Sequence, residues 1–132
     1  MKIVKKEIVI DAPAEKVWAH VTEPEKIAGW LMPNDFVPTT GAAFSLQCPH
    51  QGKISCVVKE IVPLRRLVYS FRSAATRVET LVTITLTAEG GRTRLTLVHS
   101  GWDTLPPEDQ DVADQFGGGW AGFMEKLRTA IA

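Results

Sequence analysis

The residues that most readily suggest chemistry are two cysteines and a histidine around one expected hairpin turn: Cys48, His50 and Cys56. Thiolate and imidazole are ligands that zinc prefers, so their closeness raises a zinc hypothesis. The Cys-x-His spacing, with the second cysteine further along, matches no strong zinc template, and a fourth ligand is missing. We therefore predict ordinary thiols and no metal. A disulfide between Cys48 and Cys56 and a metal site remain the alternatives.

His99 is the second candidate, because strand parity places it on an apolar face together with Leu95 and Leu97. The leading interpretation is a core histidine whose ring is hydrogen-bonded. The alternatives are a ligand anchor and a general acid or base. Apart from Asp103 at the end of the strand, no nearby acidic residue could orient the imidazole. We therefore predict no catalytic residue and favour a binding role over an enzymatic one.

The composition is that of a globular domain of ordinary size. The chain has 132 residues, of which 45% are hydrophobic, and its 15 basic side chains balance 15 acidic ones. This length predicts one domain over residues 1–132. The charge balance argues against a nucleic-acid partner, and no apolar run approaches the roughly 20 residues of a membrane span. We expect a cytoplasmic protein with reduced cysteines. Phosphate loops and the common hydrolase motifs are absent, and we predict no cofactor.

Alternating apolar and polar residues predict an antiparallel sheet of about six strands. Residues 78–87 show the clearest pattern, with Val82, Ile84 and Leu86 on one face. Gly90 and Gly91 then predict a tight hairpin into the strand that carries His99. The other expected strands are 3–10, a short one at 44–46, 53–62 and 67–72. Short connections between them favour antiparallel pairing.

Two short helices are expected directly after the first strand. Asp11 is a candidate N-cap and Pro13 would lie in the first turn of a helix that ends before Pro24. Its inward residues would be Val17, Trp18 and Val21. A second helix over about 24–31 would present Ile27, Trp30 and Leu31.

A long helix is expected at the C-terminus, with a cap and a proline start within 104–107. Its apolar stripe consists of Val112, Phe116, Trp120, Phe123, Met124, Leu127 and Ile131. The stripe contains the run Gly117-Gly118-Gly119, which costs about 2–3 kcal/mol in a helix interior relative to alanine. This cost predicts a kink, a break, or a close approach to the sheet or a ligand.

Four segments, in this order along the chain, resemble the START-like superfamily (also called SRPBCC or birch-pollen-allergen-like). They are residues 10–30, the strand pair at 62–71, the strand at 93–102 that ends His-Ser-Gly-Trp, and Gly119-Trp120 with Leu127. Within the superfamily they resemble the branch named for the activator of heat-shock protein 90 ATPase. The resemblance spans essentially the whole chain and implies an α+β helix-grip fold. In that fold a curved antiparallel sheet, with two short helices after its first strand, wraps around a long C-terminal helix packed across it.

The resemblance implies several functions, because members bind lipids, sterols or flavonoid-like molecules, act as co-chaperones in stress responses, or are polyketide cyclases. The leading hypothesis is non-enzymatic binding of a small hydrophobic molecule, lipid-like or polycyclic aromatic, between sheet and terminal helix. The expected ligand-binding residues are Trp30, Tyr69, Phe71, His99, Trp102, Phe116 and Trp120. The same side chains could instead fill a solid core. A chaperone partner and a cyclase-type enzyme using His99 and Tyr69 are the alternative functions.

Overall fold

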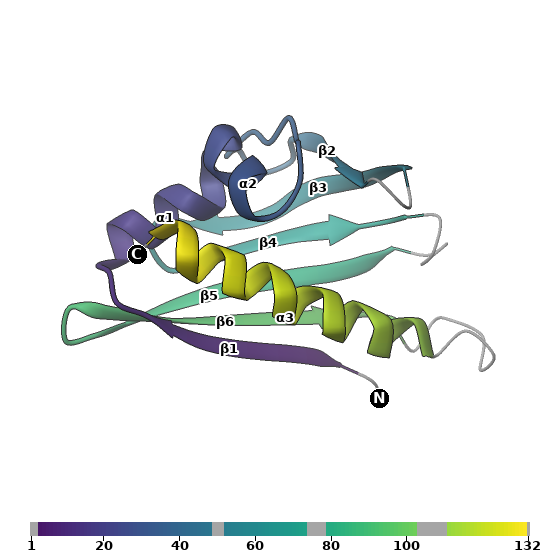
Figure 1. The fold of residues 1–132 in the computed structure, drawn as a ribbon. Helices are drawn as coiled ribbons and strands as arrows, with labels where there is room; N and C mark the ends of the chain where they lie inside the picture. The colour runs from purple at the N-terminus through teal and green to yellow at the C-terminus, as the bar shows by residue number, and fades with distance from the viewer. Residues whose placement is uncertain (1–2, 49–51, 74–78, 103–110, 132) are drawn as a thin grey trace.

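A curved sheet and the helices on its concave face form two layers (Figure 1). The computed structural model describes residues 3–48, 52–73, 79–102 and 111–131, with the side chains of the terminal helix from residue 118 onward. Within these ranges the strands are β1 Val4–Ile10, β2 Ala43–Cys48, β3 Gly52–Val62, β4 Arg66–Phe71, β5 Thr80–Glu89 and β6 Arg92–Ser100. The helices are α1 Ala14–Thr22, α2 Pro24–Trp30 and α3 Asp111–Ile131. The predicted helix-grip fold is confirmed.

The sheet is antiparallel and has the spatial order β1-β6-β5-β4-β3-β2. Val82, Ile84 and Leu86 of β5 are buried, as their alternation predicts. The β5–β6 connection is also as expected, since Gly90 and Gly91 have φ values of 59° and 88°. Positive φ at both central residues gives a hairpin turn the twist that neighbouring strands require.

The start of α1 differs from the prediction. Asp11 does not cap the helix, because Pro13 occupies the N-cap position in an extended conformation and α1 begins at Ala14. Asp11 instead lies 3.6 Å from the Arg92 side chain, while the Thr93 hydroxyl donates to the Ala12 carbonyl. The junction is therefore fixed by β6 rather than by a local cap. Of the predicted inward residues of α1, Trp18 is only half-buried.

Helix α3 crosses the concave face diagonally (Figure 1). It runs without a break through the three glycines. A Cβ added at Gly118 or Gly119 would meet nothing within 4 Å, so close contact with the sheet is not why glycine stands there. The buried part of the predicted stripe consists of Trp120, Met124, Leu127 and Ile131. The side chains of Val112 and Phe116 and the expected cap at 104–107 lie outside the described residues.

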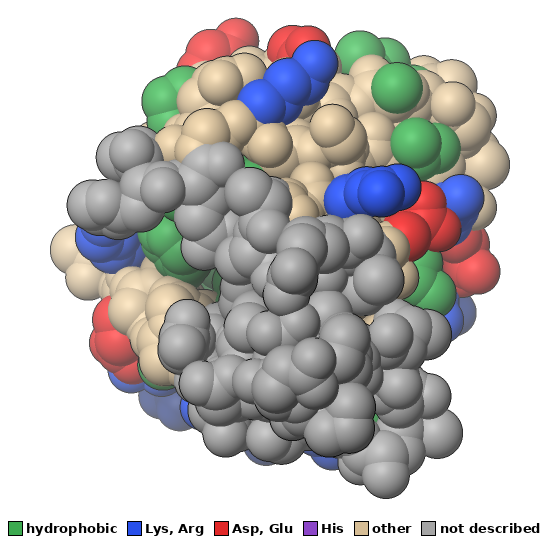
Figure 2. Space-filling view, turned by 90° about the vertical axis from the view of Figure 1, so that its right-hand side faces the viewer, with side chains coloured by type: hydrophobic (Ala, Val, Ile, Leu, Met, Phe, Trp, Pro, Cys, Tyr) green, Lys and Arg blue, Asp and Glu red, His purple; other side chains and the backbone are tan. Residues whose placement is uncertain are grey.

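Charged side chains of both signs are interspersed on the end of the molecule shown in Figure 2. On the outer face of the sheet, Arg94 donates to Glu7 at 2.6 Å and to Glu89 at 2.8 Å. None of the helices in the described ranges combines the length and the apolar character that crossing a membrane requires.

Candidate functional site

The expected site residues fall into two adjoining groups on the concave face. Phe71, Thr80, Trp102 and Trp120 surround His99, and we call these five residues the histidine cluster. Trp30 and Tyr69 line a separate small space, which we call the tyrosine cavity. Its lining residues are Val21, Ile27, Trp30, Leu31, Phe36, Phe44, Leu46, Leu67, Tyr69 and Ile84. The side chain of Phe116, the seventh expected residue, lies outside the described part of the chain.

In the histidine cluster, one chain of hydrogen bonds engages both ring nitrogens of His99. The Trp120 indole N–H donates to Nδ1 at 3.1 Å, and Nε2 lies 2.7 Å from the Thr80 hydroxyl. An indole N–H can only donate, so Nδ1 must accept and Nε2 carries the proton of the neutral ring. The Thr80 hydroxyl then accepts from Nε2 and donates to the Phe71 carbonyl at 2.9 Å. The chain therefore links α3, β6, β5 and β4.

Burial sets the charge of this histidine. The His99 side chain is 0% exposed, and desolvation lowers its pKa to about 3. The ring is consequently neutral at physiological pH and bonded on both sides. This is the arrangement of a structural core histidine and not of a general base poised near pH 7.

Gly101 positions the cluster. Its φ is +96°, and a Cβ there would lie only 3.2 Å from the Thr80 Cα. The backbone after β6 can therefore approach β5 closely only without a side chain at this position. Trp102 then folds back, and its indole N–H donates to the His99 carbonyl at 2.8 Å.

The tyrosine cavity is nearly closed. Its volume of about 10 Å³ is at the lower limit of what one water molecule needs. Phe44 packs edge-on between Phe36 and Tyr69, with ring centroids 4.9 Å and 5.3 Å away. Trp30 is held in place because its indole N–H donates to the His20 carbonyl at 2.7 Å.

Tyr69 differs from the other buried polar groups. The residue is 4% exposed, and within the described residues no hydrogen bond reaches its hydroxyl, whereas buried tyrosine hydroxyls usually have a partner. Desolvation raises the Tyr69 pKa well above its ordinary value, and the Cys56 thiol contributes in the same direction. The hydroxyl is therefore a protonated donor in an apolar lining.

The two cysteines are separate thiols. In the β2–β3 hairpin, Cys48 lies opposite Gly52 and Cys56 lies opposite Phe44. That is four residues along the strands, about 13 Å, whereas the Cα atoms of a disulfide lie about 4.4–6.8 Å apart. Both are free, and burial raises the pKa of the Cys56 thiol to about 12. His50, the third member of the zinc hypothesis, lies outside the described residues, within which no group of three or more metal-ligating side chains comes together.

Comparison with known proteins fixes the family. A family model described as "Activator of Hsp90 ATPase homolog 1-like protein" matches residues 11–132. The chain belongs to this family. A comparison with functionally curated proteins found no match.

Solved structures of similar proteins agree with this family membership. Protein MLL2253 from Mesorhizobium loti has 31% identity and a TM-score of 0.88, over 98% of this chain and 96% of that one. DynU16, from the dynemicin biosynthetic locus, has 26% identity and a TM-score of 0.85, over 98% of this chain but only 46% of its own length. The Aha1 dimer from Colwellia psychrerythraea shares the fold, with 18% identity, a TM-score of 0.85, and coverage of 99% and 96%.

Apart from the aliphatic residues that line the tyrosine cavity, the sequence prediction missed Phe36, Phe44 and Thr80. Phe44 follows the alternation of its strand and could have been included. Phe36 lies in the irregular stretch after α2, where no periodicity indicates which side chains are buried. Thr80 reaches His99 only through the pairing of β5 with β6.

Proposed function

We propose that this domain binds a small, mostly apolar molecule in the tyrosine cavity, between the sheet and the helices. The observation that carries the proposal is the buried Tyr69 hydroxyl, to which no described residue gives a hydrogen bond. An unbonded buried hydroxyl costs about 1–3 kcal/mol. A ligand that bonds it would recover that cost.

The chemistry of the cavity defines the ligand class. Because Tyr69 keeps its proton, the ligand group facing it must accept a hydrogen bond, as a ketone, ether or hydroxyl does. The lining side chains are otherwise apolar or aromatic, and nothing among them would neutralise a charged group. We therefore propose a neutral, aromatic or lipid-like molecule with one acceptor facing Tyr69. The dynemicin locus from which DynU16 comes is a biosynthetic one, which supports a small-molecule role.

Binding requires the cavity to widen. We expect the side chains of Phe36 and Leu31 to move, because both residues follow α2 and neither belongs to a helix or strand. Displacing the Phe36 ring would open the space over Phe44 and Tyr69. Phe71 and Trp120 remain proposed contacts for a larger ligand, and His99 and Trp102 would support that wall.

The test is a screen of polycyclic ketones and their parent hydrocarbons by NMR shift mapping. Ketones should shift resonances of Trp30, Phe44 and Tyr69, and Tyr69→Phe should weaken their binding about three- to tenfold. Hydrocarbon binding should be unchanged in the same variant. If no compound perturbs these residues, or if Tyr69→Phe weakens ketones and hydrocarbons equally, the proposal is wrong.

A protein-interaction role is the second candidate, favoured by membership of a family described by activation of the Hsp90 ATPase. Purified protein added to an Hsp90 should then raise its rate of ATP hydrolysis. Failure to bind the chaperone and to stimulate it would remove this candidate.

A further inference from the structure

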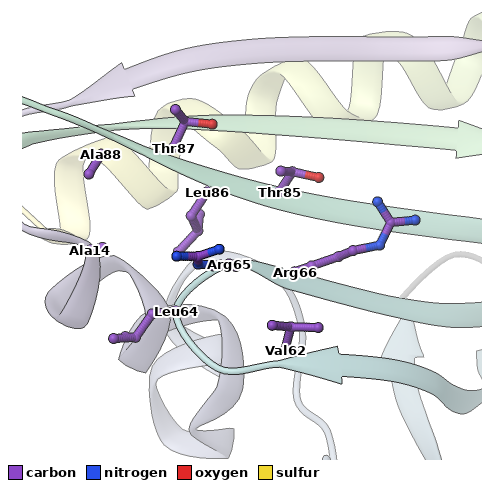
Figure 3. A pocket seen from close by; sticks show the side chains of 9 residues that line it. All are labelled: Ala14, Val62, Leu64, Arg65, Arg66, Thr85, Leu86, Thr87 and Ala88. Carbon is purple, nitrogen blue, oxygen red and sulfur yellow. The ribbon is translucent and has the colours of Figure 1, made fainter.

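A second, wide hollow lies where β3 turns into β4, near the start of α1 and the end of β5 (Figure 3). Its volume is about 590 Å³, and it shares no lining residue with the tyrosine cavity. We call it the turn hollow. Four of its lining residues lie in the β3–β4 turn or directly beside it: Val62, Leu64, Arg65 and Arg66.

Leu64 holds an unfavourable backbone conformation in this turn. The Arg65 N–H donates to the Val62 carbonyl at 3.0 Å, and Leu64 has φ = +68°. With Pro63 at the second position, this is a type II turn, whose third residue is normally glycine. Within the described ranges, Leu64 alone among non-glycine residues has a positive φ. Such outliers concentrate at functional positions.

The Leu64 side chain does not offset this backbone strain by packing into the core. It is 38% exposed, and Val62 beside it is 40% exposed. Neither belongs to the buried core or packs against it. A glycine at position 64 would make the same turn with less strain, so the apolar side chain itself calls for a role outside the fold.

Positive charge borders this apolar surface. In the described residues, Arg65 has no carboxylate within ion-pair distance, whereas Arg66 is paired with Glu60 at 2.8 Å. The start of α1 at Ala14 adds the partial positive charge of a helix N-terminus. The hollow thus offers an apolar wall beside one unneutralised guanidinium.

We propose that the turn hollow docks a segment of a partner protein that carries a large apolar side chain next to an acidic residue. The apolar side chain would pack against Leu64 and Val62, and the carboxylate would pair with Arg65. The hollow is open to solvent, whereas small-molecule sites enclose most of their ligand. This favours a protein segment over a free fatty acid, which has similar chemistry.

The test begins with random peptides displayed on phage and selected against the full chain. Selected peptides should combine acidic and large apolar residues, and should shift the amide resonances of residues 62, 64–66 and 85–88. Leu64→Gly and Arg65→Glu should each weaken binding about tenfold. Arg72→Glu, just beyond the opposite end of β4, is the matched charge control and should bind as the wild type does.

Leu64→Gly also separates docking from folding. It should keep or raise the melting temperature while losing the peptide, because it relieves strain and removes the contact. Tyr69→Phe should bind the peptide normally, so the result is independent of the tyrosine cavity. The proposal is overturned if no acidic, apolar peptide is selected, or if Leu64→Gly binds undiminished. It is also overturned if residues 62–66 instead mediate self-association, or bind decanoate but no peptide.

Discussion

At the scale of single residues, Tyr69 and His99 show two ways of holding a polar group in an apolar core. The His99 ring is bonded on both sides by Trp120 and Thr80. The Tyr69 hydroxyl is equally buried, yet no described residue bonds it. The first arrangement stabilises the fold, while the second leaves a donor that a ligand can use.

Tyr69→Phe should therefore keep or raise stability while weakening ligand binding. Removing an unbonded buried hydroxyl should increase the free energy of unfolding by about 1–3 kcal/mol, because the aromatic packing with Phe44 remains. Urea denaturation of the ligand-free protein measures this. A loss of stability would mean that the hydroxyl is bonded in solution, which would contradict our account of the cavity.

His99 should make the protein sensitive to acid. Its pKa is about 3 in the folded chain against an ordinary value of 6.5, so between these values the unfolded chain binds more protons. The free energy of unfolding should fall as the pH drops below 6.5, by up to about 1.4 kcal/mol per pH unit.

His99→Gln should flatten this dependence, at a cost of about 1–3 kcal/mol near neutrality from the disrupted hydrogen bonds. Urea titrations are best compared above pH 4.5. At lower pH, Glu7 also loses stabilisation, because its hydrogen bond from Arg94 lowers its pKa. His20→Gln is the control and should leave the acid-sensitive step in place. An unchanged slope in His99→Gln would show that another group is responsible.

At the scale of elements, α3 carries glycines that its local structure does not need. Gly118 and Gly119 are exposed, lie in a continuous helix, and have room for a Cβ. A run of glycines within a helical stripe predicts a kink or a break, yet α3 is continuous at these positions.

Gly118→Ala and Gly119→Ala should each raise the free energy of unfolding by about 0.5–1 kcal/mol. Thermal denaturation gives the sign directly. The matched control is Gly90→Ala, which should be destabilising because the φ of +59° at that position disfavours a side chain. If the α3 variants lost stability instead, these glycines would have to serve a contact that the described residues lack.

At the scale of the whole molecule, both layers share a single core. Buried residues of the sheet and of all three described helices belong to one apolar cluster, which includes Val17, Trp30, Ile84 and Leu127. Separating the helices from the sheet would therefore expose the buried apolar side chains of both layers.

We expect one cooperative unfolding transition. Tryptophan fluorescence reports on buried indoles that include Trp102 after β6 and Trp120 on α3, and far-ultraviolet circular dichroism reports on the secondary structure. The two urea curves should coincide. An earlier fluorescence midpoint would show that α3 detaches first, which would contradict a single core.

Much of this molecule could be predicted from sequence patterns that depend on neighbouring residues. The alternation in β5 and the apolar stripe of α3 predicted these elements and their buried faces, because strands and helices impose fixed periods on their side chains. Gly90 and Gly91 predicted the turn between β5 and β6. His99 was correctly expected to be a hydrogen-bonded core residue. The cap at Asp11 was wrong, because a contact with β6 determines that junction.

The sequence by itself determined the fold and most of the aromatic residues that the structure buries, with Phe36 and Phe44 as the exceptions. Only the tertiary structure decided how those residues separate into the histidine cluster and the tyrosine cavity. In the first, Trp120 and Thr80 bond His99. In the second, Tyr69 lines the cavity together with Phe36 and Phe44. Hydrogen-bond partners come from strands and helices far apart in the chain, and their meeting depends on register and packing distance. Those quantities have no periodic signal in the sequence.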